Sequence, residues 1–550
     1  MQPRHLRWVF GDLDHAETEV WHSTSDLLAR AGWLPSNQGS DPDISAVLVV
    51  APHGLPLDVQ AHVLDQASAR PVLLLGRTMT ADLPALREST GVVAKSWTEP
   101  HPARLRPQGQ STWVDRISPT GDPIELTTAV LTVEKQREAV QTWVAAQVGL
   151  ASSACLTWNP DTSLGALTVQ PQPGDDQGVA TYARLLHFAL RRVTGADSQE
   201  ATPLSIGLLG FGAIGAEHAR AAMTLPGLDL HAICDRNDER LTAAEQAFAV
   251  RTTSDANELL AGDVSTVVIS TPPDSHADWA VRTLEAGKHV VIEKPLAITT
   301  QDADRVLDCA ARVGRRVVVY QNRRFDPDFL SVQQAVRSGA LGQVFHIETF
   351  IGGYGHPCNF WHSDVGVSGG AVYDWGSHVL DQVLTLHGGR MRHVTCIEHK
   401  RRWLDVTNAD HTSLTVRFDD GAEASFVHSD LAAALKPRWY LLGTQAAITS
   451  RWRAPSVIAR NEVGTLSEDQ LSVTDAPPDV LLLDEAGAET TLAAPDQPSF
   501  PFHRQLVDDY LYSWPMSITA SQSRRVVALM EAARESAQSL GAPVAIDGER

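Results

Sequence analysis

A glycine-rich turn at residues 207–215, GLLGFGAIG, constrains the fold of this chain more than any other feature. It follows an apolar run that is typical of a buried strand, and it opens a helical pattern. Gly210, Gly212 and Gly215 have the spacing GxGxxG, in which the first glycine permits a tight turn and the second lets the backbone approach a pyrophosphate. The third lets the helix pack against the strand, with the helix N-terminus facing the phosphates. The turn therefore predicts a dinucleotide-binding βαβ unit.

An acidic residue occupies the position at which such a unit binds the ribose of the dinucleotide. Asp235 ends the next apolar strand, twenty residues after Gly215, where a carboxylate accepts from a ribose 2′-hydroxyl. This position favours NAD over NADP, but Arg236 beside it leaves NADP open, because an arginine there receives a 2′-phosphate. The predicted cofactor contacts of this part of the chain are Gly210, Phe211, Gly212, Ala213, Ile214, Gly215, Asp235 and Arg236.

The pattern of strands and helices divides the chain into three predicted domains. After a polar stretch at 194–203, short apolar strands alternate with helices, which predicts a parallel sheet covered on both faces. From about residue 340, longer and partly alternating strands predict a mostly antiparallel open sheet, and an amphipathic C-terminal helix is expected to pack on it. The expected fold class is α/β, with an N-terminal domain at 1–198, a Rossmann domain at 203–325 and an α/β domain at 326–550.

The first of these domains has a weaker signature. Strands near LRWVF, ISAVLVV and RPVLLLG with helices between them predict a flavodoxin-like α/β layer fold. The arrangement resembles the class I glutamine amidotransferase or trehalose-utilisation type of domain. The glycine-flanked nucleophile of such enzymes is missing, however, and Cys155 lies in SSACLTW rather than in a GxCxG or GxSxG elbow. We therefore expect a degenerate domain with a structural or assembly role.

Composition excludes several classes of partner. With 66 acidic and 45 basic residues the formal charge is −21, which argues against nucleic acid or an anionic membrane as the main partner. The five cysteines fall singly, without CxxC pairs, so we expect no disulfide framework and a reducing compartment. The N-terminus lacks the apolar core of a signal peptide, and no run reaches membrane-spanning length. A cytoplasmic protein with a small-molecule substrate is the expectation.

Six motifs in order resemble the glucose-fructose oxidoreductase, inositol dehydrogenase and MocA family. They are GLLGFGAIG, AICDRN, STPPDSHADWA, EAGKHVVIEKPLA, YQNRRFDPDF and GGAVYDWGSHVLDQ, and the resemblance covers roughly residues 203–550. It implies a Rossmann domain followed by a domain whose large open sheet carries the substrate site and often the oligomer interface. It also implies a cofactor cleft with further contacts from Thr271, Pro272, His276, Glu293, Lys294 and Asn322.

Lys294 follows the apolar run KHVVI, so we expect it at the carboxyl edge of the parallel sheet, where ligands bind. The proline after it biases Lys294 out of the helical region. An ammonium near a reacting hydroxyl favours alkoxide character as hydride leaves the carbon. By resemblance, Lys294, Asp374 and His378 are the catalytic set and also contact the substrate, together with Arg323 and Trp361.

Asp374, His378 and Asp381 share one face of a predicted helix, because they are four and three residues apart. A histidine there can accept a hydroxyl proton near neutral pH, while an adjacent carboxylate orients the imidazole. Two other interpretations exist: a divalent metal site, or a buried histidine satisfied by Asp374. Since no second ligand cluster is evident, no metal is predicted.

The resemblance implies an oxidoreductase that transfers hydride between NAD, or NADP, and a secondary hydroxyl of a sugar, cyclitol or related polyol. It also implies a homo-oligomer, either a dimer or a tetramer. Two alternatives remain at this point. One is a redox-neutral NAD-dependent glycosidase, in which transient oxidation acidifies a neighbouring C–H and permits elimination of the aglycone. The other is a non-enzymatic nucleotide-binding scaffold.

Overall fold

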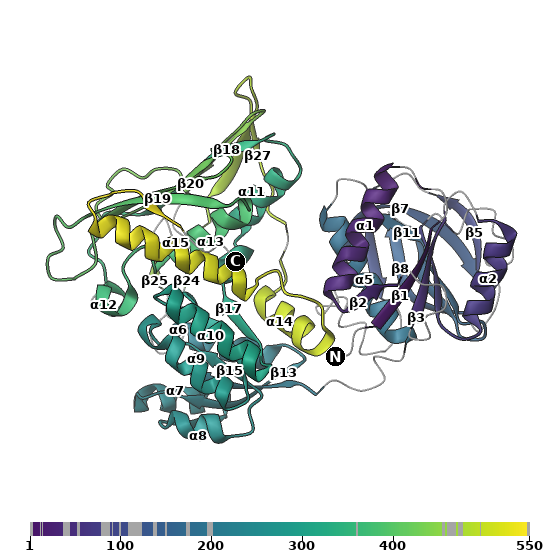
Figure 1. Cartoon of the computed structure of the whole chain (residues 1–550), viewed down its shortest axis with the longest axis horizontal. Helices are drawn as coiled ribbons and strands as arrows, with labels where there is room; N and C mark the ends of the chain where they lie inside the picture. The colour runs from purple at the N-terminus through teal and green to yellow at the C-terminus, as the bar shows by residue number, and fades with distance from the viewer. Residues whose placement is uncertain are drawn as a thin grey trace. The chain divides into compact units, whose positions relative to one another are not determined.

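Figure 1 shows a computed structural model of the chain. It describes residues 202–546 apart from 359–360, 454–456, 459–468, 471–476 and 496, and before them residues 4–10, 13, 15–36, 44–51, 55–76, 78, 89–90, 92–97, 101–107, 124–135, 140–148, 151–171 and 176–194. The chain forms two compact units. The first is Met1–Thr202 with Asp508–Pro515, and the second is Pro203–Val507 with Met516–Arg550.

The first unit contains a parallel half-sheet. Its strands lie in the order β2-β1-β3-β4-β10, and all four neighbouring pairs are parallel. This is the order of a flavodoxin-like sheet. The residues of β4 are completely buried, as expected for a strand covered on both faces. The bounds are β1 (Arg4–Phe10), β2 (Trp33–Pro35), β3 (Ile44–Val50), β4 (Val72–Leu75) and β10 (Leu164–Leu167), with helices α1 (His15–Arg30), α2 (Leu57–Ala67) and α5 (Asp176–Val193).

An antiparallel half extends this sheet beyond β10, and the sequence did not predict it. The described strands continue in the order β9-β8-β6-β7-β11, with β5 paired to β7. Every pair from β10 onward is antiparallel. The bounds are β5 (Val92–Trp97), β6 (His101–Pro107), β7 (Ile124–Lys135), β8 (Gln141–Val148), β9 (Ala151–Asn159) and β11 (Val169–Pro171).

A segment from far along the chain completes the first unit. Within Asp508–Pro515, the Asp508 carboxylate lies 2.6 Å from Arg184, and the carbonyl of Tyr512 lies 2.9 Å from Nε2 of His187. Nδ1 of His187 accepts a hydrogen bond from Trp33 at 2.9 Å, so this fully buried imidazole is the neutral Nε2–H tautomer. Burial lowers the pKa of His187 to about 3, in agreement with that tautomer.

The second unit begins with a parallel sheet in the order β14-β13-β12-β15-β16-β17. Numbered along the chain this is 3-2-1-4-5-6, the order of a Rossmann fold. The bounds are β12 (Leu204–Leu209), β13 (Leu228–Cys234), β14 (Arg251–Thr253), β15 (Thr266–Ile269), β16 (His289–Glu293) and β17 (Val317–Tyr320), with helices α6 (Ala213–Thr224), α7 (Asp238–Phe248), α8 (Ala256–Ala261), α9 (His276–Glu285) and α10 (Thr300–Val313). The predicted Rossmann domain is confirmed.

A larger mixed sheet follows, in the order β27-β26-β23-β22-β18-β21-β20-β19-β28. Only the β18–β21 pair is parallel among these described strands. The bounds are β18 (Val344–Gly352), β19 (Met391–His399), β20 (His411–Phe418), β21 (Glu423–Ser429), β22 (Trp439–Gly443), β23 (Ala447–Arg451), β26 (Asp479–Leu483), β27 (Glu489–Thr491) and β28 (Val544–Ala545), and a separate pair is β24 (Val457–Ile458) with β25 (Asp469–Gln470).

Helices α13 and α15 lie along one face of the larger sheet (Figure 1). One hydrophobic core runs from Ile269 and Ile292 of the Rossmann sheet through Val383 of α13 to Phe426 of β21. The two predicted domains that meet near residue 325 therefore share a single core. The remaining helices are α11 (Pro327–Arg337), α12 (Val365–Ser368), α13 (Trp375–Leu386), α14 (Pro501–Tyr512) and α15 (Ala520–Gln538), with the short 3-10 turns η2 (Pro273–Ser275), η3 (Asn322–Phe325) and η4 (Trp361–Ser363).

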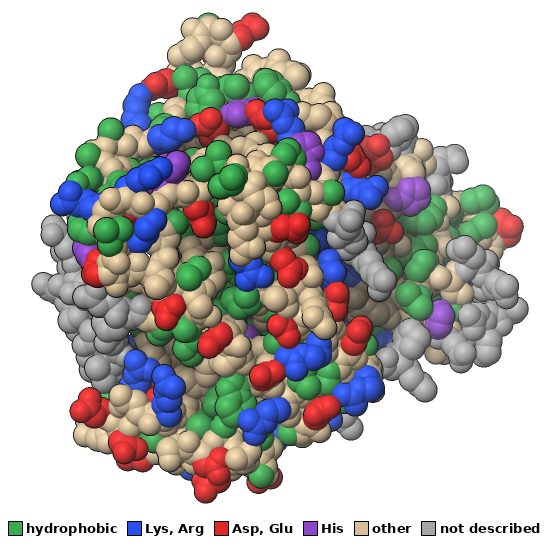
Figure 2. All heavy atoms as spheres, turned by 60° about the vertical axis from the view of Figure 1, so that its left-hand side comes forward, with side chains coloured by type: hydrophobic (Ala, Val, Ile, Leu, Met, Phe, Trp, Pro, Cys, Tyr) green, Lys and Arg blue, Asp and Glu red, His purple; other side chains and the backbone are tan. Residues whose placement is uncertain are grey.

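On the face that Figure 2 shows, neither positive nor negative side chains form a large patch. Acidic and basic side chains are interspersed there with apolar ones. A search of the described helices finds none that combines the length and the apolar character needed to cross a bilayer.

Candidate active site

The glycine turn has the geometry that a dinucleotide requires. Gly210 has φ +98°, and a side chain there would bring Cβ to 2.6 Å from the carbonyl of Ser270. At Gly215 a Cβ would lie 2.6 Å from the carbonyl of Gly210, so helix and strand are in close contact. At Gly212, the N-cap of α6, a Cβ would meet no atom within 4 Å. The space in front of the α6 N-terminus is therefore open, and the residues present fit a pyrophosphate.

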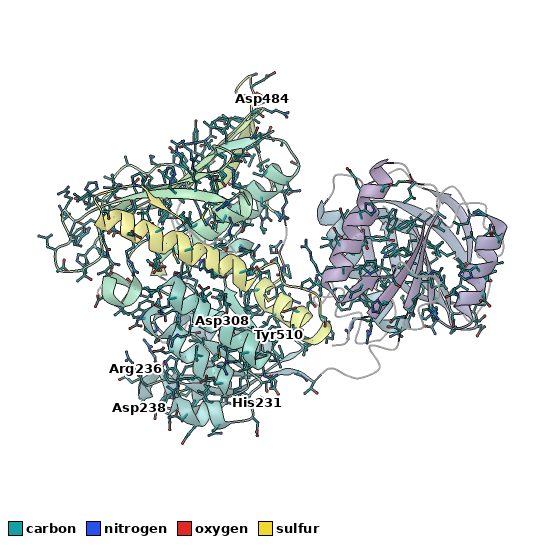
Figure 3. All side chains as sticks on the ribbon, in the orientation of Figure 1. His231, Arg236, Asp238, Asp308, Asp484 and Tyr510 are labelled. Atoms are coloured by element: carbon teal, nitrogen blue, oxygen red, sulfur yellow. The ribbon has the colours of Figure 1, made fainter. Side chains whose placement is uncertain are left out.

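Asp235 lies beside this turn, 6% exposed at the end of β13. One carboxylate oxygen accepts from the Phe211 N–H at 2.7 Å and the other from the Asn237 N–H at 2.9 Å. Each carboxylate oxygen has a second lone pair, so the group still has acceptor capacity for a ribose. Arg236 is exposed and points outward at the edge of the domain, as Figure 3 shows. Arg240, which the sequence did not single out, has its guanidinium 3.7 Å from Asp235.

His276 has a different position from the predicted one. Its side chain is fully buried, with Nδ1 2.8 Å from the Pro295 carbonyl and Nε2 2.7 Å from the Thr271 carbonyl. Burial lowers its pKa although both carbonyls act in the opposite direction. The ring of His276 therefore connects the loops that follow β15 and β16 and has no exposed surface. Thr271 and Pro272 are partly exposed at the end of β15.

Lys294 and Asp374 form the ion pair at the centre of the candidate site. Lys294 directly follows β16, and its Nζ lies 2.7 Å from Oδ1 and 3.3 Å from the carbonyl of Asp374. Burial alone would raise the pKa of Asp374, but the Lys294 ammonium, with His362 and His428, holds it below its ordinary value. Both side chains stay partly accessible, 19% for Lys294 and 31% for Asp374. An ionised pair is thus available to a ligand at the strand ends.

His378 lies one turn into α13, which begins directly after Asp374. Burial lowers the pKa of His378 well below its ordinary value, and the cations Lys294, Arg323 and Arg438 lower it further. The imidazole is therefore neutral at neutral pH and can accept a proton. Its Nδ1 is buried without a hydrogen-bond partner among the described residues. The carboxylate that was expected to orient the ring is thus not bonded to it.

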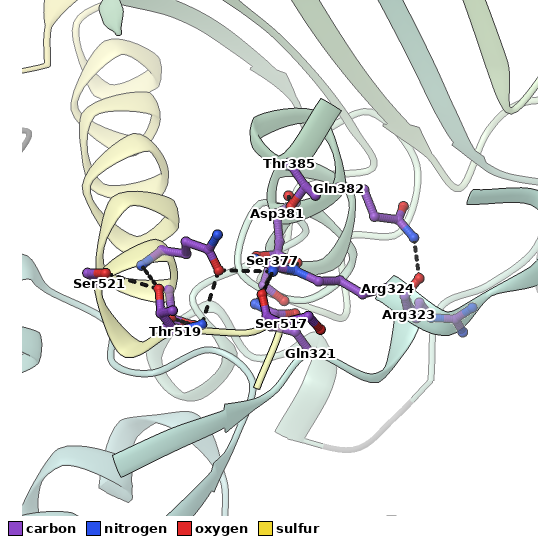
Figure 4. Close-up of polar contacts among 12 residues, drawn as sticks. Gln321, Arg323, Arg324, Ser377, Asp381, Gln382, Thr385, Ser517, Thr519 and Ser521 are labelled. Atoms are coloured by element: carbon purple, nitrogen blue, oxygen red, sulfur yellow. Dashed lines mark hydrogen bonds and ion pairs between the residues drawn. The ribbon is translucent and has the colours of Figure 1, made fainter. Parts of the chain in front are cut away.

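Asp381 shares the helix with His378 but has another partner (Figure 4). Both of its oxygens accept from the Arg324 guanidinium at 2.6 Å, and the pair is almost fully buried. Arg324 also donates to the Ser517 carbonyl at 2.9 Å and to Gln522 at 3.0 Å. Asp381 therefore fixes α13 to the end of the Rossmann sheet and to the start of α15.

The other predicted contacts lie around this centre. The guanidinium of Arg323 lies over the Trp375 ring at 4.3 Å and pairs with Asp326 at 3.1 Å. Asn322 is partly exposed in the same short turn η3. Trp361 is 38% exposed, and its ring stacks on His362 at 3.7 Å, so one face of the indole is covered by a neighbour.

Two site residues were missed by sequence reasoning. His428 lies in β21, and Asp430 comes two residues later, directly after the strand. His428 acts electrostatically on Asp374, and Asp374 acts on Asp430. Burial lowers the pKa of His428 to about 4, and burial with Asp410 raises the pKa of Asp430 to about 6. The local sequence SFVHSD contains no motif that distinguishes these two residues from those at an ordinary strand end.

Neither a metal-binding cluster nor a disulfide is found among the described residues. Among them, no group of three or more His, Cys, Asp or Glu side chains is arranged to hold a metal ion. All five cysteines are free, and four of them are buried.

Comparison with known proteins places these features in a family. Residues 204–321 match a family described as "Oxidoreductase family, NAD-binding Rossmann fold", and residues 329–449 match "GFO/IDH/MocA C-terminal domain". This part of the chain belongs to the Gfo/Idh/MocA oxidoreductase family. Its first domain is accordingly an NAD-binding Rossmann domain.

The chain is similar to an uncharacterized oxidoreductase, C115.03, of Schizosaccharomyces pombe, with 38% identity over 135 residues, which is 24% of this chain and 37% of that protein. It spans 37% to 54% of the length of the first three curated relatives. It is also similar to scyllo-inositol 2-dehydrogenase (NADP(+)) IolW of Bacillus subtilis, 24% identical over 61% of this chain and 94% of that one.

Solved structures with the same architecture include an NAD-binding protein from Listeria innocua. The TM-score is 0.54 at 27% identity, over 63% of this chain and 98% of that protein. The predicted family is confirmed by these matches.

Proposed function

We propose that this protein is an NAD-dependent dehydrogenase that acts on a secondary hydroxyl of a sugar, cyclitol or related polyol. The observation that carries the proposal is the Lys294–Asp374 ion pair, 2.7 Å across, at the carboxyl edge of an NAD-binding Rossmann sheet. The similarity to an inositol dehydrogenase supports a polyol as the substrate class.

Bound NAD would supply the hydride acceptor, and the chain's own residues would do the rest. The Lys294 ammonium would donate a hydrogen bond to the reacting hydroxyl oxygen and stabilise the negative charge that develops there. Neutral His378 would take the hydroxyl proton, because its depressed pKa leaves it unprotonated at neutral pH. Asp374 would hold the ammonium in place through its 2.7 Å contact.

NAD is the favoured cofactor because the buried Asp235 carboxylate lies beside the glycine turn, where a 2′-phosphate would meet like charge. Arg236, the residue that left NADP open, is exposed at the edge of the domain. We further propose a cytoplasmic homo-oligomer, a dimer or tetramer, in which residues 1–198 have an assembly role. Light scattering on the full chain, compared with the monomer mass of 59.6 kDa, measures the oligomer.

The test is a panel of sugars, cyclitols and their glycosides incubated with the purified full-length protein and either NAD or NADP. We expect reduced cofactor to accumulate with at least one free polyol, with a higher kcat/KM for NAD than for NADP. Release of aglycone from glycosides without any net reduction would contradict the proposal and indicate the redox-neutral glycosidase instead.

A further inference from the structure

A buried histidine pair next to Glu293 is not explained by the proposed reaction. Nε2 of His218, on α6, lies 2.8 Å from Oε1 of Glu293, and Nδ1 of His218 lies 2.8 Å from Nε2 of His503. The side chains of His218 and Glu293 are 1% and 12% exposed, and His503 is 4% exposed. Glu293 directly precedes Lys294 at the end of β16.

The Glu293 carboxylate fixes the direction of the first of these two hydrogen bonds. A carboxylate is acceptor-only, so the N–H on Nε2 of His218 donates to Glu293. In a neutral ring Nδ1 of His218 must then accept, and the donor is the Nε2–H of His503. The remaining Nδ1 of His503 has no partner among the described residues. Burial lowers the pKa of His503 well below its ordinary value, which agrees with a neutral ring there.

Aromatic packing holds the pair in one orientation. The Tyr320 ring lies 4.3 Å from the His218 ring and 4.7 Å from the Phe502 ring, between centroids. The Tyr320 hydroxyl donates to Glu217 at 2.8 Å. Because strand β17 and helices α6 and α14 all contribute, rotation of His218 would disturb three elements at once.

The second oxygen of Glu293 is free to accept a hydrogen bond from a ligand. Among the described residues Oε2 has no hydrogen-bond partner, and the side chain keeps some exposure. Strand order places β16 two positions from β12, on the side opposite β13 and Asp235. A dinucleotide straddles the first strand of such a sheet, so its adenosine half lies over β13 and its nicotinamide half over β15 and β16.

We propose that His218 and His503 are positioning residues that set Glu293 to accept hydrogen bonds from the hydroxyls of the ribose on the nicotinamide side. Asp235 and Glu293 then take one ribose each. The inference rests on cofactor binding as in the proposed function, but not on turnover, so the two fail separately.

The test uses calorimetric titration of the full-length protein with ADP-ribose and with ADP. Only ADP-ribose carries the second ribose, so the ratio of the two affinities reports on Glu293. In the unmodified protein we expect ADP-ribose to bind more tightly than ADP. In His218→Phe we expect ADP-ribose affinity to fall about 10-fold, the scale of one charge-assisted hydrogen bond, with ADP within about twofold.

Conservative and control variants separate positioning from folding. His218→Gln places an amide N–H near the position of Nε2, so it should restore ADP-ribose affinity to within about threefold. His503→Phe leaves His218 in place and should give a smaller loss in the same direction, which keeps the test valid if His218→Phe fails to fold. His231→Phe, on the exposed outer edge of β13, should change neither affinity.

Equal losses for ADP and ADP-ribose in the His218 and His503 variants would overturn the proposal, because they would indicate a purely structural role. So would equal affinities for the two nucleotides in the unmodified protein, even if that protein oxidises a polyol. A protein that binds ADP-ribose as expected but turns over no substrate would instead contradict only the proposed function.

Discussion

Among the described residues, the Lys294 ammonium is the one group that both stabilises Asp374 as an anion and lowers the pKa of His378. Its removal should therefore act on two site residues at once. For Lys294→Ala we expect kcat/KM to fall about 10²–10³-fold, the usual cost of removing one such donor. Affinity for NAD, measured by titration, should change little, because the phosphates are held by the glycine turn.

Lys294→Arg is the matched control for charge. A planar guanidinium keeps the positive charge but cannot place a compact donor 2.7 Å from Asp374 in the same way. We expect it to recover only part of the lost kcat/KM. If Lys294→Ala retained activity within a few-fold of the unmodified protein on its best substrate, Lys294 would have no catalytic role.

Single residues show clearly where sequence reasoning ends. Asp235 and Lys294 were predictable because each directly follows an apolar strand, and the ends of parallel strands share one edge. Asp381 was placed on the helix that also carries His378, but its partner Arg324 could not be predicted, because the two residues are 57 positions apart in the chain. The His218–His503 bond joins residues 285 apart, and no local pattern encodes that approach.

At the scale of elements, the glycine turn provides a prediction with an internal control. A Cβ at Gly212 meets nothing within 4 Å, whereas a Cβ at Gly215 would lie 2.6 Å from the Gly210 carbonyl. We expect Gly212→Ala to melt at the same temperature as the unmodified protein but to bind NAD at least 10-fold more weakly, because the methyl group occupies the pyrophosphate space. Thermal melting and NAD titration measure the two effects separately.

Gly215→Ala should behave in the opposite way in the melting experiment. Overpacking of helix against strand should lower the free energy of unfolding by about 1–3 kcal/mol. Unchanged NAD affinity in Gly212→Ala would show that this turn does not bind the cofactor as inferred. Equal melting temperatures for the two variants would contradict the close helix–strand packing at Gly215.

Elements of regular period were predictable, and elements defined by distant pairing were not. The Rossmann strands are short apolar runs separated by helices, and that pattern specifies their parallel order. The parallel β18–β21 pair interrupts an otherwise antiparallel sheet, and its strands are far apart in the chain. The same is true of β28, which adds an edge strand beside β19 from the chain's last described residues. Hydrophobic alternation marks such strands but carries no information about their neighbours.

At the scale of the whole molecule, buried neutral histidines should make the fold sensitive to mild acid. Burial lowers the folded-state pKa of seven histidines among the described residues: His187, His276, His289, His378, His411, His428 and His503. Since the unfolded chain binds these protons more readily, their contribution is complete above the unfolded pKa of about 6.5 and is lost as pH falls below it. Each adds a slope of up to about 1.4 kcal/mol per pH unit.

Four acids among the described residues act in the opposite sense. Burial raises the pKa of Asp430 to about 6 and also raises the pKa of Asp326, Asp381 and Glu398, so the folded state takes up protons there as pH falls. Seven histidines against four acids still leave a net loss of stability. We expect the free energy of unfolding, from urea titrations followed by tryptophan fluorescence, to fall by several kcal/mol from about pH 7 to about pH 5.

His378→Phe tests this origin of the acid sensitivity. It removes one buried histidine and keeps a ring of similar size, so the slope of unfolding free energy against pH should decrease by up to about 1.4 kcal/mol per unit. His231→Phe, at an exposed position, should leave the slope unchanged. A free energy of unfolding that stays constant between these pH values would mean that the folded and unfolded chains bind the same number of protons. The neutral state assigned to His378 as the proton acceptor would then be unsupported.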